Sequence, residues 1–323
     1  MTFSTESIRI DPSAEADRIV EALRRTVRVT LRRSGGVVGI SGGVDSAVVL
    51  ALCARAFGPE KLVALIMPER DSDPLSATLG SELAAKLGVT PIVEEITSAL
   101  EGARCYERRD EAVRRVFPHY DPAVGYRMKI WMPPNELEKE TFNAFLLTIV
   151  APDQRESTRP LSAPEFLQIV AASNLKQRTR MEMLYYHAEM RNYAVVGTTN
   201  KDEHDQGFFV KYGDGGADVM AIGHLYKSQI YQLAEYLDVP AAIRERAPTT
   251  DTYSAPCDQT EFFFRMPFGQ LDVLWHAWES MRSPADVASA TGLAESQVEI
   301  AFADFARKKR ATEYLRLAPI YIP

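Results

Sequence analysis

The sequence predicts an α/β fold, a doubly wound parallel sheet of the Rossmann-like kind. Short apolar runs typical of buried strands alternate with helical stretches through the first hundred residues. Strands joined by helices at this spacing form parallel sheets with right-handed crossovers. The first strand, 37–40, leads into a glycine-bearing turn and a helix. Ligands of such sheets bind outside the carboxyl ends of the strands, so we expect the functional site at that turn.

Composition limits the class of protein. The 323 residues are enough for one large α/β domain or two small ones. A hydrophobic share of 46% and a charged share of 25% are ordinary for a soluble globular protein. The net charge of −7 argues against binding nucleic acid through a basic surface. Without a secretory signal or an apolar run of membrane-spanning length, we expect a cytoplasmic protein with no nucleic-acid or membrane partner.

The cysteines indicate no metal or disulfide framework. Cys53, Cys105 and Cys257 are scattered and form no CxxC pair. Cys53 falls in the helix after the turn and is expected to be a small buried side chain.

The first hundred residues divide into elements as follows. Apolar residues at helical spacing predict a first helix over 12–33, capped by Asp11 or Ser13. Further along, apolar runs predict strands over 61–68 and 90–96. A helix that ends at a glycine is predicted between them, over 73–88.

Residues 104–161 differ in composition from the rest of the chain. They combine charge-rich stretches, an aromatic middle and proline clusters near Pro133 and Pro160. This composition predicts an insertion, partly helical, that lies on the main sheet or at a subunit boundary. A flexible lid is the alternative.

A long helix is predicted over 164–192. Asn174, Arg178 and Met181 share one face of it, at spacings of four and three. An arginine in a largely apolar helix requires an anionic partner. Arg178 therefore indicates either recognition of a phosphate or carboxylate, or a structural salt bridge. Three residues of this helix are expected to belong to the core: Met181, Leu184 and Tyr185.

A fourth buried strand is predicted over 193–200, and a functional loop over 200–227. The loop is too polar for a core and too rich in glycine for a helix. Glu203 is a candidate metal ligand, with a solvated acid at a helix start as the alternative. Lys211 and Lys227 are candidate contacts to a phosphate or carboxylate. Each lysine taken alone is better explained as a solvent-facing charge.

The last part, 267–317, is predicted to be helical throughout. It contains a helix-turn-helix unit in which Ser283 caps a helix and Gly292 ends it. Acids mixed with the bases, and the lack of a basic arm before it, argue against DNA recognition.

The turn after the first strand has the sequence SGGVDS, from Ser41 to Ser46. Gly42 and Gly43 allow a phosphate close to the backbone, and the helix start favours an anion. The serine hydroxyls are further donors, and the carboxylate of Asp45 suits a hard cation such as Mg²⁺. The alternative is an ordinary capped turn. SGGVDS resembles the pyrophosphate-binding loop of the ATP pyrophosphatases, which cleave ATP between its α- and β-phosphates.

Later motifs resemble one family within that group. GTTNKDEHDQGFFVKYGDGGAD from Gly197, with SNLKQRTRM upstream and APTTD downstream, is similar to the NAD synthetase family. The similarity runs in order over 37–251 and includes no glutaminase domain, so it indicates the ammonia-dependent form. It implies one domain over 1–323, with the insertion at 104–161 and the helical segment at 267–317.

The resemblance also implies a homodimer and a set of site residues. Positions matching ATP contacts are Gly39, Ile40, Ser41, Gly42, Gly43, Val44, Asp45, Ser46, Thr198, Lys227 and Thr249. Asp45 and Glu203 match ligands of Mg²⁺. Positions assigned to the substrate nicotinic acid adenine dinucleotide (deamido-NAD) are Asn174, Arg178, Lys211 and Asp218. Asp45, Lys211 and Lys227 are the residues expected to serve catalysis.

The implied reaction is amide formation from an acid and ammonia. The substrate carboxylate attacks the α-phosphate of ATP, giving an acyl-adenylate and pyrophosphate, and ammonia then displaces AMP. This chemistry needs positioning and charge neutralisation more than a nucleophilic side chain. No Ser–His–Asp or Cys–His pattern stands out in the sequence.

Two other functions stay open at this point. Tyr314 and Leu315 stand where many family members carry a basic pair, and Arg310 or Arg316 are candidate replacements. That difference favours a related enzyme that amidates another carboxylic acid. A nucleotide-binding regulator without chemistry is disfavoured because the key charged residues are present: Asp45, Glu203 and Lys211.

Overall fold

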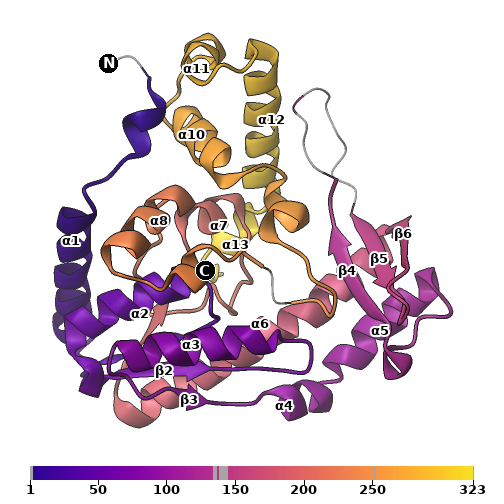
Figure 1. Ribbon diagram of the computed structural model, residues 1–323, viewed down its shortest axis with the longest axis horizontal. Coiled ribbons are helices and arrows are strands. Elements are labelled where there is room, and N and C mark those ends of the chain that lie inside the picture. The colour runs from indigo at the N-terminus through magenta and orange to yellow at the C-terminus, as the bar shows by residue number, and fades with distance from the viewer. Residues whose placement is uncertain (1–2, 134–136, 138–144, 250–251, 323) are drawn as a thin grey trace.

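In the computed structural model a five-stranded parallel sheet forms the centre of the molecule, as predicted (Figure 1). The structure describes residues 3–133, 137, 145–249 and 252–322. The strand order β3-β2-β1-β7-β8 puts the first strand in the middle of the sheet. The strands are β1 (Gly36–Gly39), β2 (Leu62–Ile66), β3 (Ile92–Val93), β7 (Ala194–Gly197) and β8 (Val219–Met220). Because every pairing is parallel, the carboxyl ends of these strands meet along one edge.

Helices cover both faces of this sheet. One face carries α1 (Pro12–Arg25), α2 (Val44–Phe57), α3 (Pro74–Lys86) and α8 (Lys227–Tyr236). The opposite face carries α4 (Thr97–Gly102), α5 (Cys105–Val116) and α6 (Ala163–Arg191). Successive residues of a strand point to opposite faces, and here both are buried: Val38 packs with the first set of helices and Val37 with the second. The doubly wound α/β fold is thus confirmed.

Local sequence explains where these helices begin and end. The Asp11 carboxylate accepts hydrogen bonds from the backbone N–H groups of Ser13 and Ala14, so Asp11 rather than Ser13 caps α1. The predicted helix over 12–33 continues past α1 as a wider π-type turn, Thr26–Thr30. β3 is shorter than the predicted strand over 90–96. The three cysteines are free and buried, Cys53 among them.

The predicted insertion contains a second sheet that the sequence did not reveal. Its strands, in the order β4-β5-β6, are antiparallel: β4 (Arg127–Trp131), β5 (Leu146–Val150) and β6 (Glu156–Pro160). Residues 134–136 and 138–144 of the insertion lie outside the described residues. The helical part of the prediction is confirmed by α5.

This small sheet packs against α5 and the first half of α6, beyond the end of the main sheet (Figure 1). The predicted position on the main sheet therefore holds for α5, whose Cys105 and Tyr106 pack with that sheet, and is wrong for the small sheet. β6 is exposed along its whole length, so its residues show none of the alternation that marks a half-buried strand. The subunit-boundary and lid alternatives stay predictions.

The stretch over 200–227 is more ordered than a loop. It begins with a helix, α7 (Lys201–Gln206), and contains β8. Asn200, Asp202 and Gln206 are fully buried, which contradicts the prediction that this stretch is too polar for a core. The helix forms because the Asn200 side chain accepts from the N–H of Glu203, whose carboxylate accepts from the N–H of Asn200.

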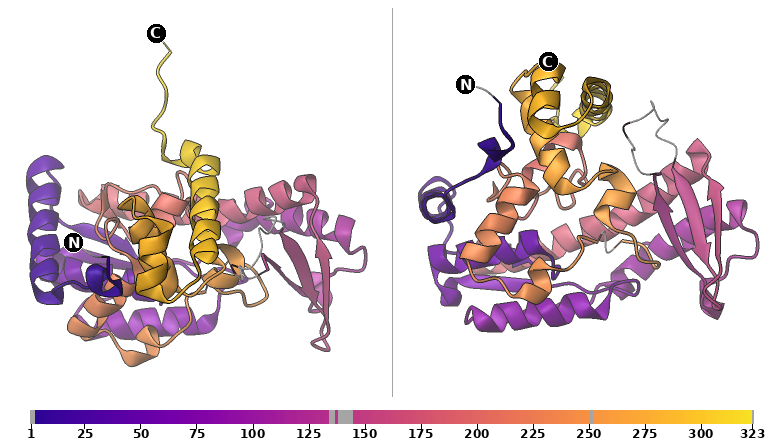
Figure 2. Two further views of the ribbon diagram at one scale, coloured as in Figure 1. Left: turned by 90° about the horizontal axis from the view of Figure 1, so that it is seen from above. Right: turned by 45° about the horizontal axis from the view of Figure 1, so that its top comes forward.

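The C-terminal part is helical, as predicted, and has its own core around Trp275 and Phe305. Ser283 caps one helix, which ends at Gly292 with a φ of +75°. The remaining helices are α9 (Ala241–Arg244), α10 (Phe268–Glu279), α11 (Pro284–Thr291), α12 (Glu295–Ala311) and α13 (Glu313–Arg316), with a π-type turn at Thr260–Phe264. Short 3₁₀ turns occur at Thr5–Ile8, Pro59–Lys61 and Pro122–Val124. Residues after α13 extend away from the body (Figure 2).

Across the described ranges, no helix has both the length and the apolar character needed to cross a membrane.

Candidate active site

A large cavity opens where the main strands end. Its volume is about 1070 Å³, and residues that follow β1, β2 and β7 line it. That volume is slightly larger than the roughly 300–1,000 Å³ typical of small-molecule sites, so more than one ligand fits. The cavity is at the edge of the sheet where the fold class predicted the site.

The SGGVDS turn lines this cavity and is tied together by its serines. The Ser41 and Ser46 hydroxyls lie 3.2 Å apart, and the Ser46 hydroxyl donates to the Gly43 carbonyl at 3.0 Å. Gly43 is the N-cap of α2, so the turn meets the positive end of that helix. These bonds shape a pocket of N–H groups and hydroxyls that suits a phosphate.

Gly42 gives the turn its shape. Its φ is +74°, and a Cβ at this position would lie 2.6 Å from the Ser76 carbonyl oxygen. We expect Gly42→Ala to lower the free energy of unfolding by roughly 2 kcal/mol, because it combines left-handed strain with a backbone clash. Urea denaturation measures this. Gly43→Ala is the matched control, since Gly43 has an ordinary φ of −96° and only the Ser41 hydroxyl within 3.4 Å of the added Cβ. Equal losses in the two variants would contradict the argument.

Asp45 lies at the centre of a charged group beside the turn. Its Oδ2 forms an ion pair with the Lys227 ammonium, and its Oδ1 accepts from the Asn200 side-chain amide at 3.0 Å. Glu203 completes the group, because its Oε2 accepts from the Asn200 backbone N–H at 3.1 Å. Asn200 thus contacts both Asp45 and Glu203, the two residues predicted to bind Mg²⁺.

The surroundings of Glu203 and Lys227 shift the pKa of each of these two groups. Burial and the Asp45 carboxylate raise the pKa of Glu203 to about 8. Burial alone would lower the pKa of Lys227, but the charges of Asp45 and Glu203 outweigh it and raise that pKa above its ordinary value. A pKa raised this far favours the protonated form of Glu203 at neutral pH.

Lys227 is held in place by two further acids. It is 1% exposed and begins α8, so it is not the solvent-facing charge that its sequence context allowed. The buried carboxylates of Asp202 and Asp272 accept from the backbone N–H groups of Lys227 and Ser228 at 2.8 and 2.7 Å. Burial raises the pKa of both acids, that of Asp272 to about 6.

Most of the residues predicted to bind ATP line the cavity. They are Gly39, Ile40, Ser41, Gly43, Val44, Asp45, Ser46, Thr198, Lys227 and Thr249. Glu203 and Asn174 line it as well. Gly42 lies just behind the lining, against the backbone of Ser76. Thr250 and Asp251 of the predicted APTTD motif lie outside the described residues.

The other residues predicted to bind the substrate lie outside the cavity lining. Arg178 donates to the Lys211 carbonyl at 3.4 Å. The Lys211 ammonium donates to the carbonyls of Tyr314 and Leu317 at 3.0 and 2.7 Å. Asp218 is exposed and accepts from the Val195 N–H at 2.8 Å. The structure thus brings Arg178 and Lys211 together, but not with Asp45 and Lys227.

Two further observations concern α6 and the C-terminal segment. Met181 and Leu184 line the cavity, although Leu184, with Tyr185, also packs against the core under the main sheet. Tyr314 and Leu315 line the cavity too. The candidate replacement Arg316 is directed elsewhere, because its guanidinium donates to the carbonyls of His204 and Lys309.

Sequence reasoning missed Asn200, Asp202 and Asp272. For Asn200 a signal was present, because an asparagine three residues before a glutamate is a capping pattern. Asp202 and Asp272 act on α8 from distant positions, and nothing in their local sequence marks them.

Comparison with known proteins decides the family. The sequence model of the family described as NAD synthase matches residues 15–115 and 149–314. The chain belongs to the NAD synthase family. The matched segments omit 116–148, which includes β4 and part of β5.

Individual members of the NAD synthase family agree with this assignment. The chain is 47% identical over 320 residues to the NH(3)-dependent NAD(+) synthetase of Rhizobium rhizogenes, covering 99% of this chain and 96% of that protein. Identity to the NH(3)-dependent NAD(+) synthetase of Thermotoga maritima is 38% over 240 residues, covering 74% and 78% of the two chains.

Solved structures share the fold. The NH3-dependent NAD synthetase from Campylobacter jejuni matches with a TM-score of 0.62 at 22% identity, over 97% of this chain and 100% of that chain. An NMN synthetase from Francisella tularensis matches with a TM-score of 0.61, also at 22% identity, over 97% and 99%. Since proteins with two different names share this fold, the fold alone does not select the acid that is amidated.

Proposed function

We propose that this protein is an ammonia-dependent NAD synthetase that converts deamido-NAD, ATP and ammonia to NAD, AMP and pyrophosphate. The observation that carries the proposal is the 47% identity to the Rhizobium rhizogenes enzyme over nearly the full length of both chains. The cavity agrees with it, because a phosphate-binding turn, a buried lysine and two acids face one space.

The reaction has two steps. A carboxylate oxygen of deamido-NAD attacks the α-phosphorus of ATP, and the bond to the bridging oxygen breaks with its electron pair leaving on pyrophosphate. Ammonia then attacks the acyl carbon, AMP leaves with the electron pair of the mixed-anhydride bond, and a proton is lost from nitrogen. The turn from Ser41 to Ser46 holds the departing pyrophosphate through N–H groups and hydroxyls. Lys227 offsets the charge that develops on the phosphates.

Asp45 and Glu203 are proposed to hold Mg²⁺. Carboxylate oxygens are the ligands that this ion prefers. Burial raises the pKa of Glu203, and repulsion from the nearby Asp45 carboxylate adds to the rise. A bound divalent ion would remove that repulsion, so the residues fit it. The ion would supply charge neutralisation at the phosphates.

Binding of Mg²⁺ should strengthen as the pH rises to about 8. Below that pH, Glu203 carries a proton that must leave before its carboxylate can bind the ion, so each ion bound releases a proton. Calorimetric titrations with MgCl₂ at about pH 7 and about pH 9, in buffers of different ionisation enthalpy, measure both effects. Glu203→Gln should bind weakly with no pH dependence over this range. Wild-type affinity that stays constant across these pH values would contradict the assignment of Glu203.

A homodimer would give Arg178, Lys211 and Asp218 a role. They lie outside the cavity lining of one protomer, yet they occupy positions that match substrate contacts in the family. We propose that deamido-NAD extends from the cavity to these residues across a contact with a second copy. Exposed apolar side chains nearby, Tyr186, Met190 and Tyr212, suit such a contact. Light scattering measures the oligomeric state.

One assay tests the proposed reaction. The protein is incubated with ATP, Mg²⁺, ammonium and deamido-NAD, and AMP and NAD are followed together. Equal amounts of AMP and NAD are expected. If AMP forms only with another carboxylic acid, that acid replaces deamido-NAD as the proposed substrate. If no AMP forms with any acid, the assignment as an adenylating enzyme is contradicted.

A further inference from the structure

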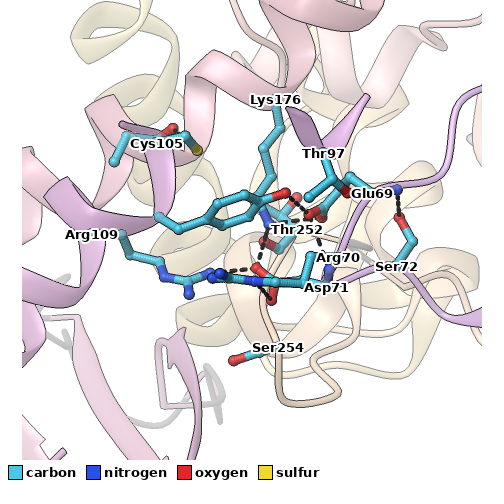
Figure 3. A network of polar contacts seen from close by, with 12 residues as sticks. Glu69, Arg70, Asp71, Ser72, Thr97, Cys105, Arg109, Lys176, Thr252 and Ser254 are labelled. Carbon is cyan, nitrogen blue, oxygen red and sulfur yellow. Dashed lines mark hydrogen bonds and ion pairs between the residues drawn. The ribbon is translucent and has the colours of Figure 1, made fainter. Parts of the chain in front are cut away.

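A second group of buried charges lies behind the cavity, apart from Asp45 and Lys227. At its centre is Lys176 on α6, which is 0% exposed. Its ammonium donates to Glu69 Oε1, Asp71 Oδ2 and the Thr252 carbonyl, each at 2.8 Å (Figure 3). One lysine therefore joins the loop after β2 to the segment after Thr249.

The rest of this network belongs to α5. Arg109 forms an ion pair with Asp71 (Figure 3). It forms another with its neighbour Asp110. The Tyr106 hydroxyl donates to Glu69 Oε2 at 2.7 Å. The side chains that pair with Lys176 are buried, Glu69 at 0% and Asp71 at 6% exposed. Arg70, whose guanidinium lies 3.8 Å from Asp71, is the exposed member of the network at 41%.

Such a network is a costly way to stabilise a fold. Removing charges from water usually costs about as much as their pairing returns, and apolar residues of the same size often stabilise as well. Buried ionic groups do, however, fix the relative positions of the segments that carry them, because each hydrogen bond has a narrow geometry.

The segments that this network joins are walls of the cavity. Glu69 and its neighbours after β2 line it, and so do Thr252 and Tyr253. Lys176 itself comes from the helix that supplies Asn174 and Met181 to the same lining. Its three hydrogen bonds therefore set the spacing of three parts of one cavity.

The segment over 252–259, here called the closing segment, is also held by β4, by Thr249 and by Glu203. The Cys257 thiol donates to the Ile130 carbonyl at 3.6 Å, Asp258 forms a bridge with Thr249, and the Gln259 side-chain amide donates to Glu203 Oε1 at 3.5 Å. Its described backbone bonds reach β4, where the Ala255 N–H donates to the Met128 carbonyl at 3.0 Å, and Pro248, whose carbonyl accepts from the Gln259 N–H at 2.8 Å. The Met128 N–H in turn donates to the Ser254 hydroxyl at 3.0 Å. The insertion and Lys176 thus hold the closing segment from outside the cavity.

We propose that Lys176 is a positioning residue for nucleotide binding: it fixes the closing segment against the loop after β2, so that the cavity is already shaped for ATP before ATP arrives. Binding to a prearranged site avoids the cost of ordering its walls. The inference rests on the proposed function only in naming ATP as the ligand.

The test uses variants that remove one positive and one negative charge together. Lys176→Met with Glu69→Gln cuts the link to Thr252 and leaves Arg109 to pair with Asp71. We expect ATP with Mg²⁺ to bind about tenfold more weakly in calorimetry, since small displacements of a site wall have effects of this size. KM for ATP should rise likewise, with kcat at saturating ATP within about twofold of wild type. Backbone amides of the closing segment should exchange hydrogen faster.

The matched control is Arg109→Met with Asp110→Asn, which removes a buried pair from the same network without touching the link to Thr252. It should lower thermal stability about as much as the Lys176→Met, Glu69→Gln variant does, and leave ATP affinity within about twofold of wild type. Should the Lys176 variant fail to fold, Lys176→Gln with Glu69→Gln keeps polar groups at both positions and has the same readouts. Equal weakening by both pairs would show a general packing effect and overturn the inference.

Hydrogen exchange separates this inference from the proposed function. Exchange in the closing segment needs no ATP, so unchanged exchange in the Lys176 variant overturns the positioning role whatever the protein binds. Failure of the wild type to bind ATP contradicts the proposed function instead.

Discussion

Replacing Asp45 with asparagine should reduce the rate of AMP and NAD formation by about 1000-fold, which corresponds to roughly 4 kcal/mol of transition-state stabilisation. Asp45 is the residue whose carboxylate contacts Lys227 and, through Asn200, is held beside Glu203. Asparagine keeps the shape and the bond to Asn200 but removes the charge. The measurement is kcat/KM for ATP at saturating Mg²⁺, ammonium and deamido-NAD.

The fold should survive this change, because Glu203 compensates for it. In the wild type, the charge of Asp45 contributes to raising the pKa of Glu203 to about 8. Without that charge Glu203 ionises more readily and becomes the partner of Lys227. The thermal midpoint should therefore change little. Asp238→Asn removes the same group from an exposed pair with Lys86 and is the control for both readouts. Near-normal turnover in Asp45→Asn would refute the role of Asp45.

Replacing Lys227 with methionine should cost both activity and stability. The variant leaves the Asp45 carboxylate without its ion-pair partner, and losses of about 3–5 kcal/mol are typical when one member of a buried pair is removed. Glu203 should keep its proton in this variant, because the nearby positive charge that favours its ionised form is gone. Urea denaturation measures the loss of unfolding free energy.

Added Mg²⁺ should restore part of the stability lost in Lys227→Met. The variant site is more negative than the wild-type site, so it should gain more from a bound cation. Lys86→Met at the exposed pair with Asp238 is the matched control and should change the unfolding free energy by about 0–1 kcal/mol. A Mg²⁺ increment no larger than that of the wild type would contradict the placement of the ion beside Asp45.

The parts of the fold and site that sequence could predict are those that local pattern encodes. The strand and turn around SGGVDS place their own N–H groups and carboxylate, so the phosphate turn and Asp45 follow from a few adjacent residues. Buried strands of a parallel sheet are continuous apolar runs, which is why the doubly wound core was predictable. Ser283 and Gly292 mark helix ends by their own chemistry.

The parts that sequence could not predict depend on partners far along the chain. Lys176 meets Glu69 more than a hundred residues away, and a single buried lysine has no signature of its own. Asp272 supports α8 in the same long-range way. β6 was missed because an exposed strand lacks alternation, and α7 because glycines beyond Gln206 masked a short capped helix.

The 29-residue helix α6 has a consequence for how the molecule can be divided. Its first half carries Ile169, which packs under the small sheet, and its second half carries Ala188, which packs under the main sheet. One continuous helix thus packs into both cores. Because domain boundaries fall in flexible linkers, no such boundary separates the two sheets. Deleting 116–148, the stretch that the family match omits, would expose the apolar side chains of the first half of α6 to solvent. The small sheet is therefore not a detachable module, and shortening this chain toward a minimal enzyme would have to redesign the surface of α6 as well.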